Sequence, residues 1–307
     1  MEFEVIAGSY EHFLIGYTIT EVEKDGDKKY TSKQSFTNNS HSGSITAITA
    51  VGKHLVSGSS DEIIRLINME ARVEHGCLQK QEGTITHLTN FEDEFLFSGS
   101  EDGSICIWKS GSWICEKTLK AHTSGVLAIS VHPSGKLALS IGKDRALKTW
   151  NLIKGRSGFV TNLKGIADTV QWSTDGTYYA VSIANRVDVY STETAKIDYT
   201  FSFGKRASRL LFLQDDILIV AGDKEAVEVH SITEKAKLVA FDAHKNRVKD
   251  VVSIPEKNMI LTASNDGFIK LWSFEEDDFT SKPSLLTQID TACRITCLAL
   301  FMKRLEG

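Results

Sequence analysis

Short apolar strands and polar turns alternate along the chain, and one pattern of this kind recurs. It is clearest in LFSGSEDGSICIWK (96–109), ALSIGKDRALKTWN (138–151) and LTASNDGFIKLWSF (261–274). Each segment has an apolar run with Ser or Thr, a turn that contains Asp, and a second run that alternates at period two and closes on Trp. Period-two alternation between turn residues predicts β-strands. We therefore expect a series of repeated hairpins.

Three weaker segments fit the same pattern: LVSGSSDEIIRLIN (55–68), YAVSIANRVDVYS (179–191) and LIVAGDKEAVEVHS (218–231). Successive Trp positions are then 41, 42, 40, 40 and 42 residues apart, and fall on Ile67, Trp108, Trp150, Tyr190, His230 and Trp272. A period of about 40–45 residues with four strands and a closing Trp is typical of WD40 β-propeller blades. Helical repeats of this length would need apolar positions at 3.6 spacing instead.

The two ends of the chain predict a seventh blade. The segment VIAGSYEHFLIGYTI (5–19) matches the repeat but lacks an inner strand before it, and RITCLALFM (294–302) resembles the inner strand within GVLAISVHP (125–133). We expect the C-terminus to give one strand and the N-terminus three, the last near 30–39, which closes the ring and removes free sheet edges. The charged segment EVEKDGDKK (21–29) is expected to be a loop. The predicted fold is an all-β, seven-bladed propeller forming a single domain over 1–307.

Composition narrows the classes of partner. The chain has 35 Lys and Arg against 40 Asp and Glu, a net charge of −5, which argues against a surface that attracts polyanions everywhere but allows local basic patches. Five cysteines, an odd number without a CxxC pair, indicate a reducing compartment. The acidic N-terminus and the lack of an apolar run of about 20 residues predict a soluble intracellular protein without a membrane partner.

A set of polar residues recurs with the repeat. With the blades counted along the chain from the repeat at 55–68, and the blade shared by the two ends counted as the seventh, it comprises His122, Ser140, Asp144 and Trp150 in blade three and His244, Thr262, Asp266 and Trp272 in blade six. A hydroxyl, an imidazole and a carboxylate together suggest a hydrolase triad, but a triad occurs once in a protein and this set occurs by blade. We therefore interpret it as a buried hydrogen-bond network that ties the strands of a blade together.

The other blades carry this polar set incompletely. Blade one has His41, Ser57 and Asp61 with Ile67 at the Trp position, blade two lacks the His but keeps Ser98, Asp102 and Trp108, and blades four and five are degenerate. The remaining histidines are scattered singly, and no metal-binding or phosphate-binding motif appears. We expect no enzyme activity, no cofactor, no metal and no small-molecule substrate.

The residue before each blade's first strand suggests a binding surface. This position holds Ser44, Thr84, Gly125, about Ile166, and then Arg206, Arg247 and Arg294 in blades five to seven, with Lys205, Lys245 and Lys249 nearby. The planar guanidinium fork suits phosphate or carboxylate. One hypothesis is an anion-binding surface for an acidic peptide or an RNA backbone. The alternative is that each Arg pairs with a local Asp or is merely solvated.

Several stretches resemble the p21-activated protein kinase-interacting protein 1 family, the animal relatives of a yeast ribosome-assembly WD-repeat protein. They include GSYEHFLIGY (8–17), EHGCLQKQEGTITHL (74–88), HPSGKLALSIGKDRALKTWNLIKGRSGFV (132–160) and NDGFIKLW (265–272). The resemblance implies a nucleolar and nuclear scaffold in large ribosomal subunit (pre-60S) biogenesis and rRNA processing, with preribosomal assembly factors and rRNA as partners. It also implies an alternative role, that of a signalling adaptor that binds and negatively regulates p21-activated kinase.

Overall fold

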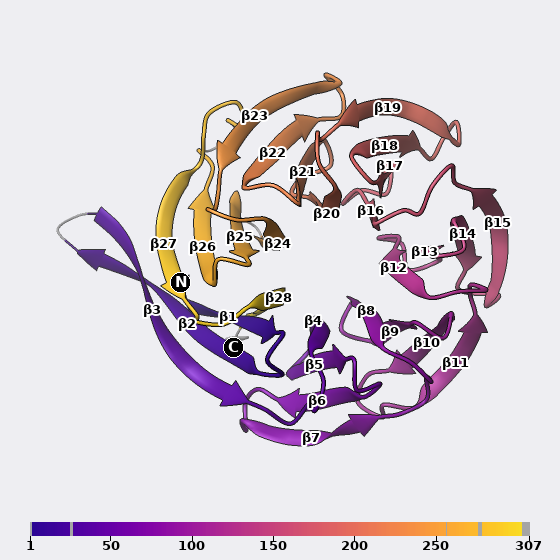
Figure 1. The fold of residues 1–307 in the computed structure, drawn as a ribbon, viewed down its shortest axis with the longest axis horizontal. Helices are drawn as coiled ribbons and strands as arrows, with labels where there is room; N and C mark the ends of the chain where they lie inside the picture. The colour runs from indigo at the N-terminus through magenta and orange to yellow at the C-terminus, as the bar shows by residue number, and fades with distance from the viewer. Residues whose placement is uncertain (1, 25–26, 256, 276–277, 303–307) are drawn as a thin grey trace.

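The chain forms a ring of seven antiparallel sheets around a central channel. The computed structural model describes residues 2–24, 27–255, 257–275 and 278–302. These residues form 28 strands and no helix, grouped into seven four-stranded sheets (Figure 1). The predicted all-β, seven-bladed propeller is confirmed. We number the six blades within the chain one to six, and the blade shared by the two ends seven.

The strands of each blade run outwards from the channel in chain order. Blade one has β4 (Ile45–Val51), β5 (His54–Ser59), β6 (Ile64–Asn68) and β7 (Val73–Leu78); blade two has β8 (Ile85–Phe91), β9 (Phe95–Ser100), β10 (Ser104–Lys109) and β11 (Cys115–Lys120); blade three has β12 (Val126–Val131), β13 (Leu137–Gly142), β14 (Ala146–Asn151) and β15 (Arg156–Asn162). Blade four has β16 (Thr169–Trp172), β17 (Tyr178–Ile183), β18 (Arg186–Ser191) and β19 (Lys196–Ser202); blade five has β20 (Ala207–Phe212), β21 (Ile217–Gly222), β22 (Ala226–Ser231) and β23 (Ala236–Asp242); blade six has β24 (Val248–Ile254), β25 (Met259–Ser264), β26 (Phe268–Ser273) and β27 (Ser284–Asp290).

The two ends of the chain close the ring in blade seven, as the sequence predicted. Its inner strand is β28 (Ile295–Phe301), which pairs antiparallel with β1 (Glu2–Ser9), and β2 (Leu14–Lys24) and β3 (Asp27–Asn38) follow outwards. The residue pairs run from Glu4 opposite Phe301 to Ser9 opposite Ile295. Because β28 belongs to the same sheet as β1, the ring is held shut by backbone hydrogen bonds between the ends of the chain.

The expectation of a loop at 21–29 is wrong. Strands β2 and β3 continue through this segment as a paired hairpin that projects beyond the ring, with Val22 opposite Lys29 (Figure 1). Opposite charges face one another across the strands, and the Lys28 ammonium lies 3.2 Å from the Glu21 carboxylate. Such cross-strand pairs stabilise a hairpin, so high charge does not make this segment irregular. Residues 25 and 26 lie outside the described residues.

The hydrophobic core lies between neighbouring blades rather than in one central cluster. The middle strands β5 and β9 are almost wholly buried, while the outer strand β15 is exposed at every position. One of the clusters joins Val56 and Leu66 of blade one to Leu96 and Trp108 of blade two. Since each blade is covered on both faces by its neighbours, the ring is stable only when it is complete.

A buried ion pair also joins blade seven to blade one. The Glu4 side chain on β1 is 1% exposed and accepts two hydrogen bonds from the Arg72 guanidinium, at 2.9 Å on Oε1 and 2.7 Å on Oε2. The Ser35 hydroxyl on β3 donates to the same carboxylate. Such a bidentate, charge-assisted contact fixes the position of the N-terminal strand against the first complete blade.

Candidate functional site

The recurring polar residues form hydrogen-bonded chains within their blades. In blade three Trp150 Nε1 donates to Ser140 Oγ at 2.8 Å, the hydroxyl lies 2.8 Å from His122 Nε2, and His122 Nδ1 lies 2.9 Å from Asp144. All four groups are satisfied when the hydroxyl donates to Nε2 and Nδ1–H donates to the carboxylate. Blade six repeats the chain, with Trp272 to Thr262 at 2.9 Å, Thr262 to His244 at 2.8 Å and His244 to Asp266 at 3.2 Å.

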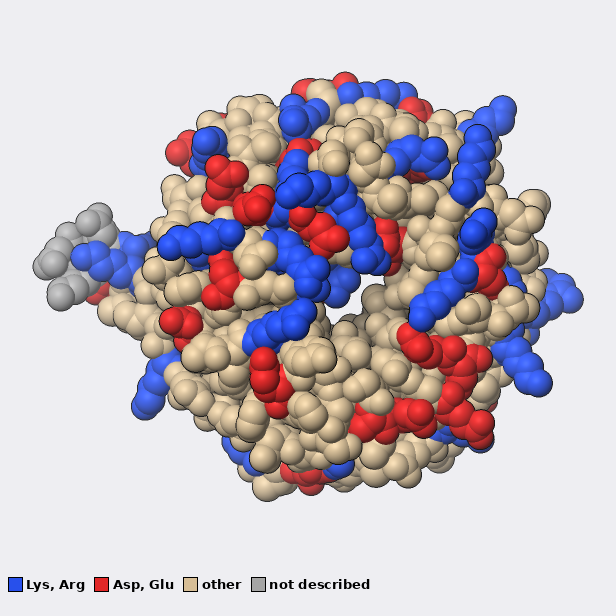
Figure 2. Space-filling model, in the orientation of Figure 1, with Lys and Arg blue, Asp and Glu red and all other residues tan. Residues whose placement is uncertain are grey.

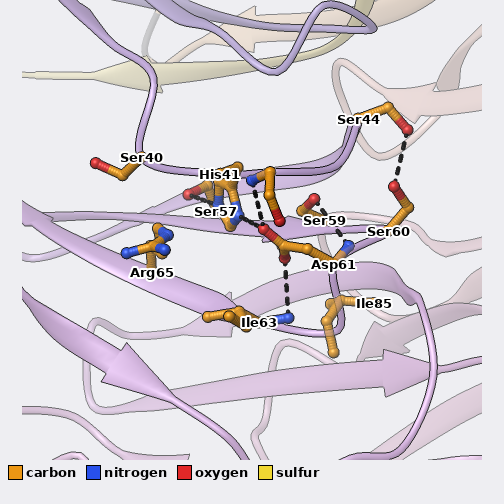
Figure 3. A network of polar contacts seen from close by, with 12 residues as sticks. Ser40, His41, Ser44, Ser57, Ser59, Ser60, Asp61, Ile63, Arg65 and Ile85 are labelled. Carbon is orange, nitrogen blue, oxygen red and sulfur yellow. Dashed lines mark hydrogen bonds and ion pairs between the residues drawn. The ribbon is translucent and has the colours of Figure 1, made fainter.

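Blade one contains the same chain without the indole. Figure 3 shows the His41 ring between the Ser57 hydroxyl, 2.8 Å from Nε2, and the Asp61 carboxylate, 2.9 Å from Nδ1. The carboxylate also accepts the backbone N–H groups of Ser42 and Ile63, so it orders the turn between β5 and β6. Ile67, at the Trp position, is 3% exposed and supplies only apolar contact.

Blade two replaces the missing histidine with Gln81, which sequence reasoning overlooked. Ser98 Oγ donates to Gln81 Oε1 at 2.6 Å and accepts from Trp108 Nε1 at 2.9 Å. The amide nitrogen of Gln81 donates to the carbonyls of Ser98 at 3.2 Å and Ser104 at 3.0 Å. The amide oxygen therefore takes the acceptor role of His Nε2, while Asp102 is held instead by the backbone N–H of Glu82.

These networks lack the access that a catalytic triad needs. The hydroxyl residues Ser57, Ser98, Ser140 and Thr262 are all 0% exposed, so no substrate reaches them. Burial lowers the pKa of His41 and His122, and it lowers the pKa of His244 to about 4, which keeps these rings neutral at neutral pH. A neutral ring with one N–H is the form that the chain of hydrogen bonds requires. The arrangement supports the structural interpretation of the repeated set.

Blades four and five have different side-chain contacts in place of the hydrogen-bonded chain of the other blades. Tyr190 stacks on Tyr179 at 4.8 Å between ring centres in blade four. In blade five the buried Glu228 carboxylate lies 2.7 Å from Lys224 Nζ and 3.1 Å from His230 Nε2. Burial raises the pKa of Glu228, but the hydrogen bonds from His230 and Lys224 outweigh this and lower the pKa to about 2.

One face of the ring carries the residues that precede the inner strands. In six blades the backbone carbonyl of this residue accepts an N–H from the turn between the second and third strands, as Tyr10 donates to Arg294 and Asp223 donates to Arg206, both at 2.9 Å. We call the face of the ring that carries these residues the arginine face. In blade four the position belongs to Asp168, since β16 begins at Thr169. Ile166, which the sequence spacing placed at about this position, lies two residues earlier and is 48% exposed in the preceding loop.

The three predicted arginines have different surroundings. Arg206 Nε lies 2.6 Å from Asp168, which matches the alternative of a local ion pair. The Arg247 guanidinium lies 3.7 Å from the Asp223 carboxylate. When the side-chain amide oxygen of Asn265 faces Arg247, that oxygen also accepts two hydrogen bonds from the guanidinium. Arg294 has no ion pair among the described residues, and its guanidinium lies 4.9 Å from the centre of the Tyr10 ring.

Positive charge gathers at the mouth of the channel on this face. Lys249 is half-buried, and its pKa is lowered by burial and by the charges of Arg247, Arg209 and Arg294, although Asp223 partly opposes this. The structure therefore brings together Arg247, Lys249 and Arg294, and it adds Arg209, which sequence reasoning missed. Arg209 lies 2.9 Å from Asp250 in the channel wall. Figure 2 shows Lys and Arg side chains gathered on one side of the channel opening.

The predicted lysines complete this cluster of charge. The ammonium groups of Lys205, Lys245 and Lys249 form no ion pair with any residue that the structure describes. Lys205 and Lys245 are exposed in the loops before β20 and β24. We call the predicted set of six the basic arc: Lys205, Arg206, Lys245, Arg247, Lys249 and Arg294. Two of the six side chains, Arg206 and Arg247, lie beside carboxylates, and the other four have no ion pair among the described residues.

The described residues contain no candidate metal centre: no group of three or more His, Cys, Asp or Glu among them is placed to hold a metal ion. No helix there is long and apolar enough to cross a membrane. The channel contains a hollow of about 270 Å³, whose lining includes His87, Arg209 and Asp250.

Comparisons with known proteins agree with this architecture. The family described as WD domain, G-beta repeat matches residues 32–68, 75–109, 113–151 and 235–273. The p21-activated protein kinase-interacting protein 1 of Mus musculus is 45% identical over 98% of this chain and 80% of its own length. The p21-activated protein kinase-interacting protein 1-like protein of Danio rerio is 42% identical over 97% and 80%. Protein MAK11 of Saccharomyces cerevisiae is 28% identical over 99% and 84%. The chain belongs to the p21-activated protein kinase-interacting protein 1 family of WD40-repeat proteins.

Proposed function

We propose that the chain is a non-enzymatic scaffold in assembly of the large ribosomal subunit. The observation that carries the proposal is the basic arc on the arginine face, in which four of the six cations have no ion pair among the described residues. Preribosomal particles are rich in RNA phosphate, and a cluster of this kind attracts phosphate. The resemblance of the sequence to relatives of a yeast ribosome-assembly WD-repeat protein supports the same function, and the similarity to Protein MAK11 is a similarity to a yeast protein over 99% of this chain.

The architecture suits a scaffold. The closed ring holds its loops in fixed positions, so a partner that binds one face meets a preorganised surface. The hydroxyl and imidazole groups that could suggest a hydrolase are buried and occupied by the networks within the blades. Expected partners are preribosomal assembly factors and rRNA, and the expected location is the nucleolus and nucleus.

Affinity purification tests the proposal. The tagged protein is purified from cells with and without ribonuclease, and bound proteins and RNA are identified by mass spectrometry and sequencing. The proposal predicts large-subunit precursors in the untreated sample. Their loss after ribonuclease indicates contact that depends on rRNA, whereas their persistence indicates contact through assembly factors. Recovery of neither precursor rRNA nor assembly factors would overturn it.

The names of the relatives favour a second candidate function. The mouse and zebrafish proteins are named for interaction with p21-activated protein kinase. A kinase-binding adaptor of this fold would inhibit the kinase stoichiometrically, with one adaptor molecule bound to each kinase molecule and no catalytic turnover by the adaptor. Titration of purified p21-activated kinase against the protein tests this, and unchanged kinase activity at a molar excess would rule out the inhibitory role.

A further inference from the structure

An exposed aromatic ring lies at the edge of the basic arc. Tyr10 is 55% exposed and is the first residue of the turn between β1 and β2. Its backbone N–H donates to the Arg294 carbonyl at 2.9 Å, and the Arg294 guanidinium lies 4.9 Å from the centre of its ring. An accessible aromatic ring beside a run of cations is the combination with which proteins hold single-stranded nucleic acids, because every base has a face that can stack.

Lys249 takes a place that other blades give to threonine. The second residue of the inner strand is Thr46, Thr86 or Thr296 in blades one, two and seven, and its hydroxyl donates to a carbonyl of the next blade. Blade six has Lys249 there, on β24. Lys249 lies two residues after Arg247, on an inner strand that packs beside β28, and β28 begins directly after Arg294. Cations gathered on neighbouring inner strands repel one another, so an anion that binds between them gains from each.

The opposite side of the arginine face carries more carboxylates than cations. The turns and loops of blades one and two that reach this face carry the exposed residues Glu62, Glu82, Glu101 and Asp102, against Lys80 in the same loop as Glu82 and Lys143 of blade three, which lies 2.7 Å from Glu101. Figure 2 shows acidic side chains gathered on the side of the channel opposite the basic cluster. A polyanion is therefore attracted to blades five to seven and repelled from blades one and two, which gives it a defined track.

We propose that the arginine face binds single-stranded RNA, with backbone phosphates on Arg247, Lys249 and Arg294 and an unpaired base stacked on Tyr10. The inference deepens the proposed function, on which it rests for the choice of RNA as the polyanion. Stacking requires an unpaired base, so a duplex satisfies the phosphate contacts alone. An acidic peptide would likewise use the cations without the aromatic ring.

Fluorescence anisotropy of the full chain with a fluorescein-labelled oligouridine of about 12 nucleotides tests the proposal, over salt from about 50 to 200 mM. We expect the R247A/K249A variant to bind at least about ten-fold more weakly, with a salt slope shallower by about 1.4 for two lost phosphate contacts. The Y10A variant should lose about five-fold or more in affinity for oligouridine, with an unchanged salt slope, and the Y10F variant should bind oligouridine like the wild type. The matched control K154A/R156A removes two exposed charges where β14 turns into β15 in blade three, outside the proposed site, and should bind normally.

The outcomes separate the inference from the proposed function. Thermal unfolding of each variant shows that it is folded. The inference is overturned if oligouridine fails to bind, if Y10A binds like the wild type, or if polyglutamate of equal charge competes as well as RNA. If oligouridine binding fails while large-subunit precursors still copurify, the scaffold function stands without this site. If binding behaves as expected but no precursors are recovered, the RNA site stands and the proposed function fails.

Discussion

Replacing Arg72 with alanine should destabilise the ring strongly. The Glu4 carboxylate, 1% exposed on β1, receives two charge-assisted hydrogen bonds from Arg72. Without Arg72, the Ser35 hydroxyl is the one side-chain partner that the described residues leave to this buried charge. Breaking a buried ion pair in this way costs about 3–5 kcal/mol. For a chain of this size, each kcal/mol lowers the unfolding midpoint by about 2 °C, which gives a fall of about 6–10 °C.

Thermal and urea unfolding followed by circular dichroism measure this effect. The K53A variant is the control, since Lys53 forms an exposed ion pair with Glu70 at 3.9 Å in blade one, the blade that also carries Arg72. Its loss should lower the free energy of unfolding by less than about 0.5 kcal/mol. The double variant E4M/R72M removes both charges and should recover most of the loss. A loss below about 1 kcal/mol for R72A would refute the view that this pair secures blade seven.

Three further predictions concern the networks within the blades. Q81A should cost about 2–4 kcal/mol, because Ser98 and two carbonyls lose their partner, whereas Q81H should cost less than Q81A in urea unfolding. The pKa of His244 is about 4 in the folded state against an ordinary 6.5, so the unfolded state binds the proton first. The contribution of His244 to the free energy of unfolding is complete above pH 6.5 and decreases as the pH drops towards 4, with a loss of about 2 kcal/mol at pH 5. Equal free energies of unfolding at pH 7 and pH 5 would contradict this prediction. G142A places a methyl carbon 2.5 Å from the His122 ring and should lower the urea midpoint, and an unchanged midpoint would show that the ring can shift freely.

The register of the propeller could be predicted from the sequence because it depends on local chemistry. Turn residues, period-two alternation and a closing Trp recur at nearly constant spacing, and the predicted Trp positions all lie on the third strand of a blade. The origin of blade seven followed from the same pattern at the two ends. Gln81 was missed because its role depends on where its amide oxygen points, which a search for histidine does not detect.

The site was only partly predictable. The register of the inner strands placed Arg247 and Arg294 on one face, and Lys249 next to them on β24. The pairing of Arg206 with Asp168 depends on the short β16, which sequence spacing did not reveal. The contact between Tyr10 and Arg294 joins opposite ends of the chain and exists only because the ring closes. Contacts between distant segments of this kind come from topology rather than from any local pattern.

The ratio of free large to small ribosomal subunits in cells depleted of the protein tests its proposed role in large-subunit assembly. The ratio is read from sucrose gradients after complementation with the wild type, with R247A/K249A/R294A or with K154A/R156A. We expect depletion to lower large subunits selectively, and we expect the wild type and K154A/R156A, but not the triple variant, to restore them. A normal subunit ratio after depletion would contradict a role in large-subunit assembly, and full rescue by the triple variant would show that the basic arc is not its contact.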